Sequence, residues 1–305
     1  MATEDQEEEI ETGEPADLAE EISSKQVAEA PTDTGDPQSI IEAEIPVDIR
    51  ERYEVYSYRN AAVILSKTRR AQFDEILTAL RDFRITRQMI QKSGGNESDI
   101  PKLLSAVLRP LGWYETVIQG DLRVTLTWRG KVREKKSGKN KGDPVFGKLS
   151  REVLREKYLD GHKIDYVKDR VAFDLEWNSK DQTFDRDLYA FNAFFLSGVI
   201  DAGVLVTRSK SLDRVFKALG PALKKDGVTI ERKSSGMPRG TFEKYGASTT
   251  WMGKLLYRLN AGRNGGCPVL AIGITPRCIA DWTEEDEKLA ATLPAEPGSE
   301  EDSEG

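Results

Sequence analysis

Histidine and cysteine are almost absent from this sequence of 305 residues. His162 is the only histidine, and Cys267 and Cys278 are the only cysteines. A Ser-His-Asp or Cys-His hydrolase would have to be built on His162 alone, and a His/Cys zinc site lacks ligands. Two cysteines do not form a disulfide framework, and a chain of this length does not need one. We expect both cysteines to pack as small apolar residues and His162 to be structural.

Long hydrophobic runs and a basic leader are also missing. No apolar run approaches the roughly 18 residues of a membrane span. The first residues, MATEDQEEEI, are acidic, unlike a secretory or mitochondrial leader. We therefore expect a soluble, cytoplasmic protein that has no membrane partner.

The formal net charge of −7 hides three unlike regions. Residues 1–45 carry a net charge of −14 and residues 283–305 a net charge of −8, which leaves +15 for residues 46–282. Both acidic ends lack aromatic residues, so we expect disordered tails on either side of one basic domain. The tails are either inert or compete, as polyanions, with the ligand for the basic face of the domain.

The spacing of apolar residues predicts helices alternating with strands. The order predicts an α/β (α+β) domain with a mixed central sheet flanked by helices. Residues 131–144 are rich in Lys and Gly, which predicts a flexible basic loop. The expected helices lie within 61–91 and at 100–108, 149–159, 185–197, 211–219 and 248–259. The expected strands are 121–128, which we expect to be half-buried, 162–167, 171–177, 202–207 and 269–275.

Carboxylates gather in the predicted hairpin IDYVKDRVAFDLEWNSK. Asp165 lies in its first strand. In the second, Asp174, Glu176 and Asn178 alternate with apolar residues, so strand geometry places them on one face. Gathered carboxylates repel each other unless a cation joins them, and Mg²⁺ is the usual cation. The alternative is an ordinary solvated face that nearby Lys and Arg side chains neutralise.

The pattern Asp-x₁₀-Glu-x-Asn across this hairpin resembles the PD-(D/E)XK nuclease core. Residues 163–195 look most like the BglII/BstYI type of type II restriction endonucleases. The resemblance implies Asp165 and Glu176 as metal ligands, with Asn178 in the third position of the motif. An amide there can orient a water but supplies no positive charge. Lys180 could supply the missing cation, and Asp174 could be a further ligand.

The function that this resemblance implies is Mg²⁺-dependent hydrolysis of double-stranded DNA at a short specific site. Asp165 and Glu176 would hold the metal, and Asn178 and Lys180 would position water or offset charge. The resemblance also implies a homodimer, a palindromic target and a cognate DNA methyltransferase. Two alternatives stay open: a non-catalytic DNA-binding protein on a degenerate nuclease fold, and a repair or junction nuclease.

Two basic segments are candidates for contacting DNA phosphates. The first is the predicted basic loop, and the second includes Arg239. The alternative is a merely solubilising surface, but a net charge of +15 in one domain favours a polyanionic ligand. The candidate DNA-binding residues are Lys131, Arg133, Lys135, Lys136, Lys139, Lys141 and Arg239.

Overall fold

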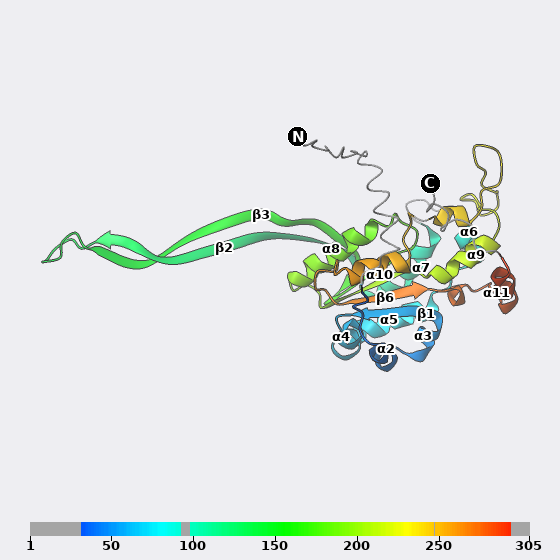
Figure 1. Cartoon of the computed structure of the whole chain (residues 1–305), viewed down its shortest axis with the longest axis horizontal. Helices are drawn as coiled ribbons and strands as arrows, with labels where there is room; N and C mark the ends of the chain where they lie inside the picture. Colours follow the sequence, from blue (N-terminus) through cyan, green and yellow to red (C-terminus); the bar gives the residue numbers. More distant parts are fainter. Residues whose placement is uncertain (1–31, 93–97, 247, 294–305) are drawn as a thin grey trace, which may run out of the picture.

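A six-stranded mixed sheet forms the centre of the protein in its computed structural model, which describes residues 32–92, 98–246 and 248–293. The strand order is β1-β6-β5-β4-β3-β2 (Figure 1). β4, β5 and β6 run parallel, whereas β1, β2 and β3 pair with their neighbours antiparallel. The predicted fold class is confirmed.

Helices cover both faces of the sheet and make two hydrophobic cores. On one face, the side chains of α2, α3, α4, α5, α7 and α9 pack against residues such as Phe173 and Val204. On the other, α8 and α10 pack against Ala172 and Leu205. The three parallel strands are buried on both faces, as the continuous apolar sequences of β5 and β6 predict.

The elements have the following bounds. The strands are β1 Tyr53–Tyr58, β2 Tyr114–Glu134, β3 Pro144–Lys168, β4 Val171–Glu176, β5 Ala202–Arg208 and β6 Val269–Ile274. The helices are α2 Gln38–Glu44, α3 Val47–Arg52, α4 Ala61–Thr68, α5 Arg70–Asp82, α6 Arg87–Gln91, α7 Asp99–Leu108, α8 Thr183–Leu196, α9 Asp213–Ala218, α10 Met252–Asn260 and α11 Glu284–Ala291. Short 3-10 turns are η1 Arg109–Leu111, η2 Lys210–Leu212, η3 Phe242–Tyr245 and η4 Pro276–Cys278.

The helix predicted at 149–159 is wrong, because these residues lie in β3. β2 and β3 have 21 and 25 residues and pair with each other along a ribbon that projects far from the body (Figure 1). Pairing with β2 along this length outweighs the local preference of 149–159 for a helix. The ribbon also corrects two expectations: residues 131–134 extend β2 rather than forming a loop, and strand 121–128 is largely exposed.

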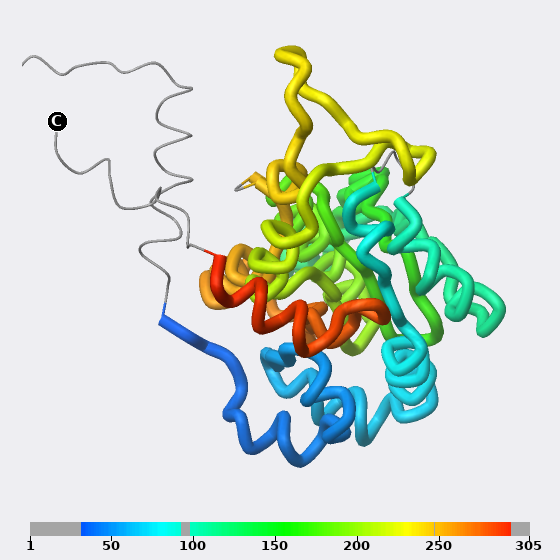
Figure 2. The backbone as a smooth tube through the Cα atoms, turned by 90° about the vertical axis from the view of Figure 1, so that its right-hand side faces the viewer, coloured from blue at the N-terminus to red at the C-terminus, as the bar shows by residue number. Residues whose placement is uncertain are grey.

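Ordered helices extend past both predicted boundaries of the basic domain. α2 buries Ile41 in the first core, although it lies in the acidic region 1–45. α11 begins with a capping box between Thr283 and Asp286, and acidic residues in a first turn favour helix formation. Ion pairs from Arg87 and Arg214 hold it to the body, and it crosses the front of the molecule in Figure 2. Residues 1–31 and 294–305 of the predicted tails lie outside the described residues.

We predict that Gly203→Ala destabilises the fold. A Cβ atom at Gly203 would lie 2.4 Å from the ring of Phe191, which is fully buried between α8 and the sheet. Forcing these layers apart should lower the free energy of unfolding by about 1–3 kcal/mol, measured by urea denaturation. Gly246→Ala is the matched control, because a Cβ there meets no atom within 4 Å. Equal stability of the two variants would contradict the prediction.

Candidate active site

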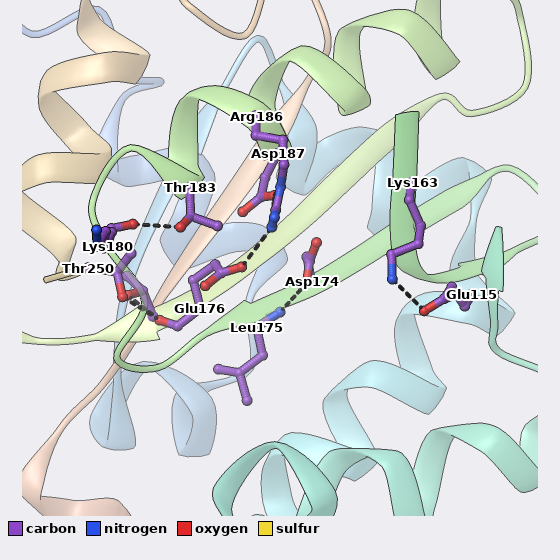
Figure 3. A network of polar contacts seen from close by, with 11 residues as sticks. Glu115, Lys163, Asp174, Leu175, Glu176, Lys180, Thr183, Arg186, Asp187 and Thr250 are labelled. Carbon is purple, nitrogen blue, oxygen red and sulfur yellow. Dashed lines mark hydrogen bonds and ion pairs between the residues drawn. The ribbon is translucent and has the colours of Figure 1, made fainter. Parts of the chain in front are cut away.

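Two acidic side chains of β4 point toward α8. Phe173 and Leu175 join the first core, so Asp174 and Glu176 face the opposite way, as the alternation predicts. Both acids are buried, with 3% and 7% of their surface exposed. Thr207 donates a hydrogen bond of 2.7 Å to the carbonyl of Glu176 and fixes the end of the strand. Figure 3 shows the two carboxylates beside the first turns of α8.

A third buried carboxylate, Asp187, comes from α8. Its Oδ2 is buried without a hydrogen-bond partner. Its Oδ1 accepts a hydrogen bond of 2.9 Å from Nη2 of Arg186, and the same nitrogen lies 3.5 Å from Oε1 of Glu176 (Figure 3). Arg186 therefore bridges two acids while most of its own side chain stays in solvent.

The pKa values of these three acids are raised, because the acids are buried close to one another. Burial, together with the charge of Glu176, raises the pKa of Asp187 to about 8. Burial also raises the pKa of Asp174 well above its ordinary value, and the charges of Asp187, Asp165 and Glu176 add to the effect. The pKa of Glu176 is raised by burial as well, against the opposing effect of a hydrogen bond from Ser179.

Asp165 joins this group from β3. Tyr166 pairs with Phe173 in the antiparallel register, which brings the preceding residue of β3 next to Asp174. The charge of Asp165 raises the pKa of both Asp174 and Glu176, so it lies near them. The structure therefore brings together Asp165, Asp174 and Glu176.

The described contacts of Asn178 and Lys180 are with residues other than these acids. β4 ends at Glu176, so strand alternation no longer decides where Asn178 points. Its amide is exposed and donates a hydrogen bond of 3.1 Å to the carbonyl of Lys244. Lys180 is exposed on the loop that leads to α8, where its backbone pairs with Thr249.

Sequence reasoning missed Asp187 and Arg186. Asp187 follows Phe184 by three residues and precedes Phe191 by four, so helical spacing places it on the buried face of α8. A carboxylate on the apolar stripe of a helix was therefore a readable signal. Arg186 had no such signal, because its contacts depend on how α8 packs against β4.

The model of the BglII/BglIII restriction endonuclease family matches residues 53–274. The chain belongs to this family. It is accordingly a site-specific deoxyribonuclease that acts on double-stranded DNA, and the family predicted from the sequence is confirmed. The match spans β1 to β6, so it includes both β4 and the ribbon. No match was found among curated protein sequences.

The acids of this endonuclease are oxygen ligands of the kind that a hard cation takes. They would supply only part of the ligand shell of such an ion. Within residues 32–92, 98–246 and 248–293, no three or more His, Cys, Asp or Glu side chains form a ready-made metal site. Mg²⁺ does not require one, because one or two carboxylates hold it while waters and substrate phosphate complete its shell. Oxygen donors, raised pKa values and the unpartnered Oδ2 of Asp187 fit such an ion.

The predicted DNA-binding residues occupy two places. Lys131 and Lys135 are exposed near the far end of the ribbon and pair with Glu134 and Asp143. Arg239 is ion-paired with Glu231 at 2.8 Å, in the segment between α9 and η3 that projects from the body in Figure 2. The other four candidate DNA-binding residues are exposed, as Lys131 is: Arg133, Lys136, Lys139 and Lys141.

None of the helices in the described part of the chain has the length and hydropathy to cross a membrane.

We predict that Asp187→Asn flattens the pH dependence of stability in the metal-free protein. Folded Asp187 keeps its proton up to about pH 8, whereas an unfolded Asp loses it near pH 4. The folded state thus binds more protons in this window, so its stability is greatest at the acidic end and falls as the pH rises. The asparagine amide resembles the protonated acid but does not titrate. The stability of the variant should therefore fall less than that of wild type as the pH rises.

Urea denaturation in EDTA at about pH 5 and pH 8 measures the effect. Asp82→Asn at the exposed end of α5 is the control and should behave like wild type. An unchanged pH dependence in the Asp187→Asn variant would contradict the pKa assigned to Asp187.

Proposed function

We propose that this protein is a Mg²⁺-dependent type II restriction endonuclease that hydrolyses double-stranded DNA at a short specific site. The observation that carries the proposal is the group of buried carboxylates, Asp174, Glu176 and Asp187, within a basic domain. Acids that share a buried site need protons or a cation. The proposal includes a homodimer on a palindromic target, a cytoplasmic location and a cognate DNA methyltransferase that protects host DNA.

Asp165 and Glu176 would hold Mg²⁺, with Asp174 between them as a third carboxylate. The register of β3 and β4 supports this set, because it joins the ends of two strands at one face. When bound, Mg²⁺ polarises a phosphoryl oxygen and lowers the pKa of a water. Waters and a DNA phosphate would supply the ligands that these carboxylates do not.

The remaining residues orient the acids and offset charge. Ser179 and Thr207 hold the carboxylate and the carbonyl of Glu176 in place. These contacts fix the position of Glu176 as a metal ligand. Arg186 lies 3.5 Å from Oε1 of Glu176, and it can offset the charge that develops on the phosphate.

DNA phosphates would be held by the basic residues of the ribbon and by Arg239. The candidates at the far end of the ribbon are Lys131, Arg133, Lys135, Lys136, Lys139 and Lys141. Their contribution would be independent of sequence and sensitive to salt. The positions of Asn178 and Lys180 favour roles outside the group of acids, at the loop that leads to α8.

We predict that Asp165→Asn and Asp174→Asn each lower the rate of DNA cleavage by at least about 100-fold. Unmethylated phage DNA is incubated with Mg²⁺ or EDTA, and discrete bands are quantified. Asn178→Ala is the matched control and should cut at close to the wild-type rate, because the side-chain amide of Asn178 donates its hydrogen bond to the carbonyl of Lys244. Loss of cleavage in the Asn178 variant, with Asp174→Asn active, would contradict this set of ligands.

Binding of the same DNA without cleavage, with Mn²⁺ also tried, would refute the catalytic proposal. It would favour the DNA-binding protein on a degenerate nuclease fold. Cutting confined to branched substrates would instead favour the junction nuclease.

We predict that Arg186→Gln lowers the cleavage rate by roughly 100-fold or more, as the loss of charge stabilisation in a transition state does. Lys180→Gln, which removes the same charge six residues earlier, should change the rate little. Single-turnover cleavage at saturating DNA separates this effect from binding. A larger loss in the Lys180 variant would assign the compensating cation to Lys180 instead.

A further inference from the structure

The ribbon of β2 and β3 begins beside the carboxylates and extends far from them. At its base, Lys163 pairs with Glu115 at 2.8 Å (Figure 3), and the charge of Asp165 on the same strand also acts on Lys163. From Ile118 to Glu134 the ribbon is two-stranded, and a rise of about 3.3 Å per residue makes this part about 50 Å long. That length corresponds to roughly 15 base pairs of duplex DNA.

The two faces of the ribbon differ in chemistry. One face carries an apolar row in which Val124 pairs with Val153 and Trp128 with Leu149. The alternate positions form the other face, the polar face. Its members in β2 are Arg123, Thr125, Thr127, Arg129 and Lys131, and the residues opposite them in β3 are Leu154, Glu152, Ser150, Lys148 and Phe146.

Like charges lie directly opposite each other on the polar face. Arg129 pairs with Lys148 in the register, and Lys131 follows Arg129 on the same face. Like charges in opposite positions destabilise a sheet, and a two-stranded ribbon alone is only marginally stable in water. An anion between these side chains removes the repulsion. The hydroxyl groups of Thr127 and Ser150, the next pair along, are also donors that phosphate oxygens accept.

We propose that the polar face of the ribbon binds phosphates of the DNA that flanks the cleavage site, up to roughly 15 base pairs away. Residues 123–152 carry ten Lys or Arg and three Asp or Glu, a net charge of +7, which complements a polyanion and repels the ribbon of a second copy. A two-stranded ribbon also fits the major groove. The proposal rests on the proposed function only in taking duplex DNA as the ligand.

The salt dependence of binding tests this proposal in the full chain. The variant Arg129→Gln with Lys148→Gln removes two charges from the polar face. The matched control, Arg151→Gln with Arg155→Gln, removes two charges from the apolar face of the same ribbon. Fluorescence anisotropy without Mg²⁺ gives the affinity of each protein for random duplexes of about 14 and about 45 base pairs, between roughly 50 and 200 mM salt.

We expect the polar-face variant to reduce the slope of log affinity against log salt by about 1.8 on the long duplex, which is about 0.9 for each lost phosphate contact. On the short duplex its slope should equal that of wild type, because the body alone covers that DNA. The control should match wild type on both. Circular dichroism checks that both variants are folded.

Equal losses in the two variants, or an equal loss on the short duplex, would overturn the proposal. The assay uses random DNA without metal, so its result does not depend on cleavage. Failure of the cleavage experiments alone would refute the proposed catalytic function and leave the ribbon as a DNA-binding arm.

Discussion

Burying carboxylates side by side is the constraint on which the rest of this structure depends. Each buried charge is costly unless it is paired or protonated, and here Asp174, Glu176 and Asp187 share one small volume between β4 and α8. The arrangement raises their pKa values, and Arg186 contacts both Glu176 and Asp187. Apolar residues at these positions would pack without this penalty. The penalty therefore points to a site that is completed by a cation and a phosphate from outside the chain.

The two cores keep these acids in place. α8 approaches the sheet closely because Gly203 leaves room for the ring of Phe191, and Asp187 lies one turn earlier on the same helix. Any shift of α8 would change the distance between Asp187 and Glu176. Packed interiors transmit small displacements rather than absorb them. The positions of the acids therefore depend on contacts between apolar residues that take no part in the reaction.

The sequence predicted those parts in which local patterning and burial agree. The alternation of β4 placed Asp174 and Glu176 on one face, and the buried strands gave the fold class. The alternation did not extend to Asn178, because the strand ends before it and its side-chain amide donates a hydrogen bond to the carbonyl of Lys244. The helix predicted at 149–159 failed for a different reason. Its pairing partner lies about 30 residues earlier in β2, and local spacing contains no information about such a partner.

Charge is divided between the body and the ribbon in a way that follows from electrostatics. A group of acids repels the phosphate that it must act on, so affinity for DNA has to come from elsewhere in the chain. The ribbon supplies positive charge at a distance well beyond the screening length of about 8 Å at physiological salt. Its charges therefore neither neutralise the acids nor depend on them. In the proposed function, the two ends of strand β3 would serve separate roles, because Lys148 would bind DNA while Asp165 would hold the cation.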